Sequence, residues 1–143
     1  MKKRILAILF IFSFILTACS SNKSIRFKLV NEKENFERIT TLTVDGDEVL
    51  SVEEVEKRKQ ITDKEFEELK GSMKNLNSIE GVKFEVEKGA DIVSIRFFMD
   101  LRRVSSEFIE YMGAPLDSKR NHKLEKFEEF FLNNGYKKVL DDQ

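Results

Sequence analysis

The chain has 143 residues, enough for one ordinary domain. It carries 25 basic and 26 acidic residues, and this balance excludes the strongly basic surface that nucleic-acid binding requires. A single cysteine rules out an intramolecular disulfide bond, and a single histidine leaves no ligand set of the usual spacing for a zinc ion.

The N-terminal residues have the pattern of a bacterial secretion signal. A basic start at residues 2–4 precedes residues 5–16, which are apolar except for Ser13. This run is shorter than the roughly 20 apolar residues that a membrane-spanning helix needs, and it lacks the polar face of a buried amphipathic helix. We therefore predict a signal peptide over residues 1–18.

The sequence LTAC at residues 16–19, directly after the apolar run, resembles the lipobox of bacterial lipoproteins. In those proteins a diacylglycerol is attached to the cysteine thiol, and a dedicated peptidase cuts just before it. The resemblance implies that Cys19 is the lipidated first residue of the mature chain and that residues 19–23 form a short tether. The alternatives are an ordinary cleaved signal and a retained anchor.

Lipidation of Cys19 would determine where the protein works. Loss of residues 1–18 removes three basic groups and takes the formal net charge from −1 to about −4. Such a domain is not expected to adhere by charge to anionic lipid, so its membrane contact is expected through acyl chains such as palmitate, whose burial is favourable by ~0.8 kcal/mol per CH₂. We expect the protein in the cell membrane, lipid-anchored on the extracytoplasmic face, or in the outer membrane of a Gram-negative host.

The domain that follows, residues 24–143, opens with three segments of β character. Residues 24–30 alternate apolar and polar side chains, which is the period of a half-buried strand. Residues 36–44 are rich in Thr, Ile and Val, and an Asp-Gly-Asp turn at residues 45–47 predicts a hairpin. The next segment, 48–60, fits a helix loosely. We predict a strand with a bulge or a change of face there, because the hairpin turn and three valines favour β structure.

A helix is predicted to begin after Ile61. Thr62 and Glu65 form the two halves of a capping box, and Ile61 and Phe66 occupy the hydrophobic-staple positions. One apolar stripe continues at helical spacing until the chain approaches Gly81, and we interpret it as a core-facing stripe rather than a cofactor site. The stripe consists of Phe66, Leu69, Met73 and Leu76.

Two further strands are predicted at residues 81–87 and 92–99, with a turn over residues 88–91 between them. The second strand carries apolar side chains on both faces. This pattern is typical of a central strand that is contacted on both sides.

Two helices are predicted towards the C-terminus. Ser105 or Ser106 caps a short helix that ends at Met112. The last helix is expected to start near Asp117 or Ser118.

The last helix is predicted to end in a Schellman motif. If Gly135 takes the left-handed position, Tyr136 meets Phe131 in the contact that accompanies this motif. Together the segments predict an α+β fold with an antiparallel sheet of about five strands, in the order meander, helix, hairpin and C-terminal helices, packed on one side by helices.

The sequence contains no motif typical of a catalytic, cofactor or metal site. Neighbouring acids point apart on a helix or a strand, so we interpret the acidic pairs as solvated surface. The acids at residues 45–48 lack the spacing of a calcium-binding loop and are explained by a hairpin turn. His122 is expected to be an exposed helix residue. The acidic pairs are at residues 53–54, 67–68, 128–129 and 141–142.

Three arginines, Arg96, Arg102 and Arg103, are close enough in sequence to approach one another near a strand end. Guanidinium groups suit the recognition of carboxylates or phosphates. In a chain that is 36% charged, we interpret these three as ordinary surface residues.

The whole pattern resembles the YehR-like family of small bacterial lipoproteins, whose function is not established. The resemblance covers residues 24–139 and is carried by TLTVDGDEVL, DKEFEELKGSMKNL, IEGVKFEVE and NNGYKKV. It implies an α+β domain with an antiparallel sheet behind a lipobox and a short tether, and it supplies no catalytic residues. The sequence departs from the family in being rich in Phe and Arg around residues 96–103.

We therefore expect a lipid-anchored, non-catalytic binding or interaction module without a cofactor or metal. Its partners are expected to be the membrane, through acylated Cys19, and a small ligand or an envelope protein, but not a nucleic acid. One alternative is a structural or assembly partner in the cell envelope. The other is a small carboxylate-based envelope enzyme, which would need two acids in one pocket with shifted pKa values.

Overall fold

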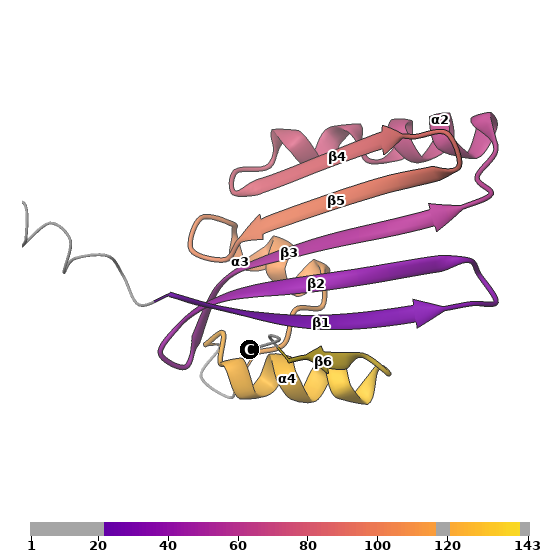
Figure 1. The fold of residues 1–143 in the computed structure, drawn as a ribbon. Helices are drawn as coiled ribbons and strands as arrows, with labels where there is room; N and C mark the ends of the chain where they lie inside the picture. Colours follow the sequence, from indigo (N-terminus) through magenta and orange to yellow (C-terminus); the bar gives the residue numbers. More distant parts are fainter. Residues whose placement is uncertain (1–21, 117–120, 141–143) are drawn as a thin grey trace, which may run out of the picture.

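The computed structural model describes residues 22–116 and 121–140 (Figure 1). Its strands are β1 (Lys23–Asn31), β2 (Phe36–Asp45), β3 (Glu48–Lys59), β4 (Val82–Lys88), β5 (Ile92–Asp100) and β6 (Lys137–Val139). Its helices are α2 (Asp63–Ser72), the 3₁₀-helix η1 (Lys74–Ser78), α3 (Ser106–Tyr111) and α4 (Leu124–Asn133).

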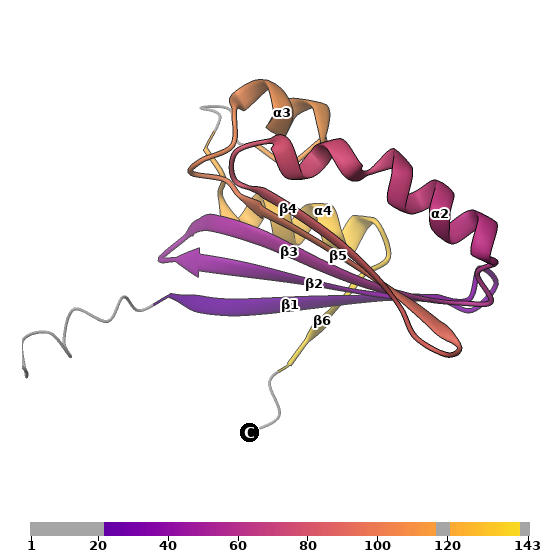
Figure 2. The same cartoon turned by 90° about the horizontal axis from the view of Figure 1, so that it is seen from above.

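The six strands form one antiparallel sheet in the order β4-β5-β3-β2-β1-β6. Figure 2 shows α2, α3 and α4 on the same side of this sheet, with no helix of the described chain on the other side. The predicted α+β class, with an antiparallel sheet packed on one side by helices, is therefore confirmed. In addition, β6 extends the sheet beyond the expected five strands, although three residues are too few to show a period in the sequence.

Strand β3 contains the bulge that its valines suggested. The pairing of β2 with β3 shifts register between Thr43 and Val44, and Leu50 becomes the extra residue of β3. Because of this insertion, Val49 and Val52 both reach the core, where they are 1% and 6% exposed. The segment is a strand throughout, so the helical alternative for residues 48–60 is wrong.

The capping box at the start of α2 is present. The Glu65 amide donates to Thr62 Oγ1 at 3.3 Å, and the Thr62 amide donates to Glu65 Oε2 at 2.8 Å. The helix is shorter than the apolar stripe predicted, because it ends at Ser72 and continues as η1. Within α2 no side chain is fully buried, and of the predicted stripe only Leu76, in η1, packs against the main core cluster.

Asn77 in η1 covers the outer edge of β4. Its Oδ1 accepts from the Phe84 amide at 2.6 Å, and its Nδ2 donates to the Phe84 carbonyl at 2.9 Å. These bonds occupy backbone groups that an edge strand would otherwise leave open for pairing with another chain.

Helix α3 begins as predicted, with Ser105 as its N-cap. The predicted start of the last helix is wrong, because α4 begins at Leu124; Asp117 and Ser118 lie outside the described residues. The chain before α4 is extended instead, since Lys123 forms an isolated β-bridge to Glu48.

His122 also belongs to this extended segment rather than to a helix. It is half-buried, and its carbonyl accepts a hydrogen bond from the Val49 amide at 2.8 Å. The interpretation of His122 as an exposed helix residue is therefore wrong.

Aromatic packing joins α4 to the sheet. Phe27, Phe127 and Phe131 are 0%, 1% and 4% exposed, and the rings of Phe27 and Phe131 stack with their centroids 5.0 Å apart. Each buried phenylalanine stabilises the fold by roughly 1.5–3 kcal/mol relative to an exposed one. The core therefore fills the space between the sheet and the C-terminal helices.

The ends of two other predicted segments differ in detail. Lys23 lies in β1 rather than in the tether, and residues 19–21 lie outside the described residues. Strand β5 is central in the sheet, between β4 and β3. The expected contact on both of its faces is not found, because no helix of the described chain covers its second face, where Ile92 is 40% exposed. Within the described ranges, no helix has the length and apolarity needed to cross a bilayer.

Gly81 provides a test of this packing. It has φ +80°, and a Cβ atom there would lie 2.8 Å from Val104 Cγ2 and 3.1 Å from the Val104 amide nitrogen. Gly81→Ala is therefore expected to lower the free energy of unfolding by about 2–4 kcal/mol in urea unfolding followed by circular dichroism.

Gly46→Ala is the matched control, because Gly46 has φ +60° but nothing within 4 Å of the added carbon. Its expected loss is about 1 kcal/mol, from the left-handed backbone alone. Equal losses in the two variants would contradict the close contact between Gly81 and Val104.

Candidate functional site

Charged side chains occupy the helix-covered face of β2 and β3. Residues directly opposite in an antiparallel pair lie on the same face. Arg38 is opposite Glu56, and the buried Leu42 is opposite the buried Val52 on that same face. Counting in twos from Val52 along β3 reaches Glu54 and then Glu56. The core face of the two strands thus changes from apolar to ionised part of the way along the sheet.

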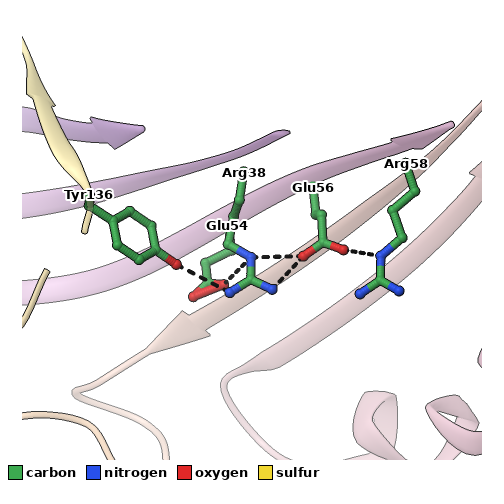
Figure 3. Close-up of polar contacts among 5 residues, drawn as sticks. All are labelled: Arg38, Glu54, Glu56, Arg58 and Tyr136. Atoms are coloured by element: carbon green, nitrogen blue, oxygen red, sulfur yellow. Dashed lines mark hydrogen bonds and ion pairs between the residues drawn. The ribbon is translucent and has the colours of Figure 1, made fainter. Parts of the chain in front are cut away.

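Glu56 lies at the centre of these charges. It is 5% exposed, yet both of its carboxylate oxygens are engaged (Figure 3). Arg38 donates to Oε2 from Nε at 2.8 Å and also from Nη2, and Arg58 donates from Nε to Oε1. A buried carboxylate is tolerated when it is paired and hydrogen-bonded in this way.

Tyr136 reaches the same group from the end of α4. Gly135 has φ +83°, and the Tyr136 amide donates to the Phe131 carbonyl at 3.0 Å. The two rings meet edge to face at 5.0 Å, so the predicted Schellman motif and its side-chain contact are confirmed. The motif places Tyr136 where its hydroxyl accepts from Arg38 Nη1 at 3.2 Å.

The partners of Arg38 keep it charged. Burial lowers its pKa, but the hydrogen bonds to Tyr136 and Glu56 and the charges of Glu54 and Glu56 outweigh burial and raise the pKa above its ordinary value. Arg38 is therefore a permanent cation whose charge is already surrounded by acceptors.

Glu54 is held less tightly than Glu56. Its closest ionic partner is Arg38 Nε, 3.8 Å from Glu54 Oε2, which is beyond hydrogen-bond distance. Burial raises the pKa of Glu54 and the charge of Glu56 raises it further, while Arg38 opposes the rise. No residue of the described chain donates a hydrogen bond to this carboxylate.

Thr40 lies directly opposite Glu54 and carries an unsatisfied hydroxyl. It is fully buried, and its hydroxyl has no hydrogen-bond partner among the described residues. Buried polar groups normally have partners, so the Thr40 hydroxyl is an exception on this face of the sheet, next to the charged side chains.

A cavity of about 340 Å³ lies over this part of the sheet. Arg38 and Glu54 are its only charged lining residues, and Tyr136 adds a hydroxyl. Met112 and Phe130 are 41% and 42% exposed, so the cavity opens to the surface between α3 and α4. Much of its wall is apolar: Phe97, Met99, Met112, Phe127, Phe130 and Phe131.

The neighbouring acids Glu53 and Glu54 point to opposite faces, as expected for a strand. Glu54 lines the cavity, whereas Glu53 pairs with Arg96 on the open face at 3.5 Å. The three arginines singled out in the sequence do not cluster. Arg102 pairs with Asp100 at 2.9 Å and Arg103 pairs with Glu80 at 3.2 Å.

In the acidic hairpin turn, Asp47 forms an ion pair with Lys123. Lys123 Nζ lies 2.9 Å from Asp47 Oδ2, and its hydrogen bond lowers the pKa of Asp47. In residues 22–116 and 121–140, no group of three or more His, Cys, Asp or Glu side chains is placed to hold a metal ion. Cys19 lies outside the described residues.

Sequence reasoning missed the site although a signal was present. Alternation from Leu42 back along β2 leads to Arg38, and alternation from Val52 along β3 leads to Glu54 and Glu56. These positions belong to the apolar face, where a charge is unusual. We interpreted Glu53 and Glu54 as a pair of surface acids and did not take into account that the side chain of Glu54 lies on the core face of its strand.

Two solved structures share this fold. The NMR structure of the YehR protein of Escherichia coli has 18% sequence identity and a TM-score of 0.67, covering 87% of this chain and 96% of that chain. The NMR structure of a protein from Streptococcus pneumoniae TIGR4 has 14% identity and a TM-score of 0.61, covering 85% and 87%. Neither a protein-family model nor a curated protein sequence matches the chain. The likeness therefore shows a YehR-like fold, without a function.

Glu56→Gln is expected to destabilise the protein. The amide keeps the shape of the side chain but leaves the half-buried Arg38 without its main counter-charge, and breaking a buried pair costs about 3–5 kcal/mol. Because Arg58 is 43% exposed and can turn to water, we expect a loss near the lower end, about 3 kcal/mol, in urea unfolding. Glu53→Gln breaks an exposed pair and is expected to cost about 0–1 kcal/mol. Equal losses would contradict the central role of Glu56.

Glu54→Gln is expected to change the pH dependence of stability. A raised carboxyl pKa contributes stability that is complete below the unfolded value and is lost as the pH rises through the folded value. Unfolding free energies measured between pH 4 and pH 8 should therefore show the variant gaining on the wild type as the pH rises, and then a constant difference. A variant that loses stability relative to the wild type as the pH rises would contradict the raised pKa.

Proposed function

We propose that the protein is an extracytoplasmic lipoprotein of the YehR-like family that binds a small ligand without transforming it. The single observation behind the binding function is the open cavity whose apolar walls meet the charged side chains of Arg38 and Glu54. An apolar cavity with a few convergent polar groups is the usual form of a small-molecule site.

The expected lipid anchor rests on the N-terminal sequence. LTAC follows a basic start and an apolar run of signal-peptide length, and Cys19 precedes the first residue of β1 by four positions. The YehR-like fold is consistent with the family resemblance seen in the sequence. An anchor so close to β1 would keep the domain within about 15 Å of the bilayer surface.

Binding is favoured over carboxylate catalysis by the state of the two acids. Glu54 and Glu56 do converge, as an acid–base pair would require, but Arg38 lies against both of them. Glu56 is also held by Arg58, so neither of its oxygens is available to a substrate proton. A single less engaged carboxylate, Glu54, suits recognition better than paired acid–base chemistry.

The anchor is tested by labelling growing cells with a fatty-acid analogue. The wild-type protein is expected to carry the label and to sediment with membranes. Cys19→Ala is expected to lose the label completely, because the thiol is the proposed attachment point, whereas Ser20→Ala should keep it. Continued labelling of Cys19→Ala would contradict lipidation at this residue.

A further inference from the structure

We propose that the cavity binds a small organic cation, an amine with an aliphatic or aromatic body, and that Glu54 recognises its ammonium group. This inference rests on the proposed binding function and names the ligand class. It follows from which polar groups at the cavity floor are already engaged and which are free to accept.

An anionic ligand does not fit the floor. Arg38 is the only cation that lines the cavity, and it already donates to Glu56 through Nε and Nη2 and to Tyr136 through Nη1. These bonds use three of its five N–H groups, and an anion at the other two would stand beside the carboxylates of Glu54 and Glu56. Like-charge contacts of this kind oppose binding at low dielectric.

A cation meets the opposite situation at Glu54. This carboxylate lies 3.8 Å from Arg38 Nε and receives no hydrogen bond from the described chain. An ammonium group supplies the hydrogen-bond donors that the half-buried carboxylate lacks and adds a second positive charge to that of Arg38. Hydrogen bonds between charged partners are about twice as strong as neutral ones.

The walls suit the rest of such a ligand. Phe97, Phe127, Phe130 and Phe131 bring aromatic rings to the cavity, and aromatic faces attract cations as well as apolar groups. The volume of about 340 Å³ lies at the lower end of the usual range for ligand sites, so it suits a compact amine. Met112 and Phe130 at the mouth extend the apolar surface that the body of the amine would contact.

The methionines allow a local test on the full chain in detergent micelles. Met99 and Met112 line the cavity, while Met73 follows α2 outside it and serves as an internal reference. Protein labelled with ¹³C at the methionine methyl groups is titrated with 2-phenylethylamine, neutral 2-phenylethanol or anionic 3-phenylpropionate. Glu54→Gln and Glu53→Gln are the test and control variants, and because both sit in the same micelles, partitioning of the probe affects them equally.

The amine is expected to shift the Met99 and Met112 signals in a saturable way, at least tenfold more tightly than the alcohol or the carboxylate. Glu54→Gln should weaken this binding at least tenfold, and Glu53→Gln should leave it unchanged. Equal or tighter binding of the alcohol or the carboxylate, or unchanged amine binding in Glu54→Gln, would overturn the ligand class while leaving a binding site. The absence of a saturable shift with all three probes would overturn both the ligand class and the cavity as a binding site.

Discussion

The ion pair between Arg38 and Glu56 is the constraint around which the rest of the structure is arranged. It places two charges on the face of the sheet that also carries the apolar core, and removal of such charges from water costs several kcal/mol per ion before pairing. Arg58 and the Tyr136 hydroxyl supply the remaining partners. Figure 1 shows α2 along β4 and α4 along β6, at opposite edges of the sheet, so neither helix lies directly over the charged part of β2 and β3. The cavity lies over this part of the sheet, lined by residues that follow α3 and by residues of α4.

The site depends on how α4 ends as much as on the strands. The Schellman turn at Gly135 redirects the chain into β6 and brings Tyr136 to Arg38, so one backbone motif both completes the sheet and supplies a side chain of the site. At the other end of α4, Lys123 is tied to the turn before β3 by the bridge to Glu48 and the ion pair with Asp47. Long-range contacts at both ends therefore determine the position of this helix and the aromatic wall that it provides.

Local sequence signals predicted much of this fold. The features that they missed depend on contacts between residues that are distant in the sequence. Alternation, β-branched composition and the Asp-Gly turn located five strands. The Thr62–Glu65 pair located the start of α2, and Gly135 located the end of α4. Each of these signals lies within a few residues of its effect. The predicted start of α4 was wrong because Lys123 pairs with Glu48, a residue 75 positions earlier in the chain. The sequence did not reveal the site for a related reason. Glu54 is recognised as a core-facing charge only when alternation is followed from buried Val52 and combined with the pairing of β3 to β2. The fold shared with the Escherichia coli and Streptococcus pneumoniae proteins does not supply a function, since one fold serves many sites.

Our proposal is that the charges on β2 and β3 serve binding, and that stability requires only that these charges be paired when they are present. Replacing Arg38, Glu54 and Glu56 together tests it most directly, because well-packed apolar side chains in place of a buried ionic group are often neutral or stabilising by about 1–4 kcal/mol. For Arg38→Met/Glu54→Leu/Glu56→Leu, we expect a free energy of unfolding at neutral pH at least equal to that of the wild type. We also expect the loss of the response of Met99 and Met112 to 2-phenylethylamine. A folded triple variant that is less stable by about 2 kcal/mol or more, or one that still binds the amine, would contradict it.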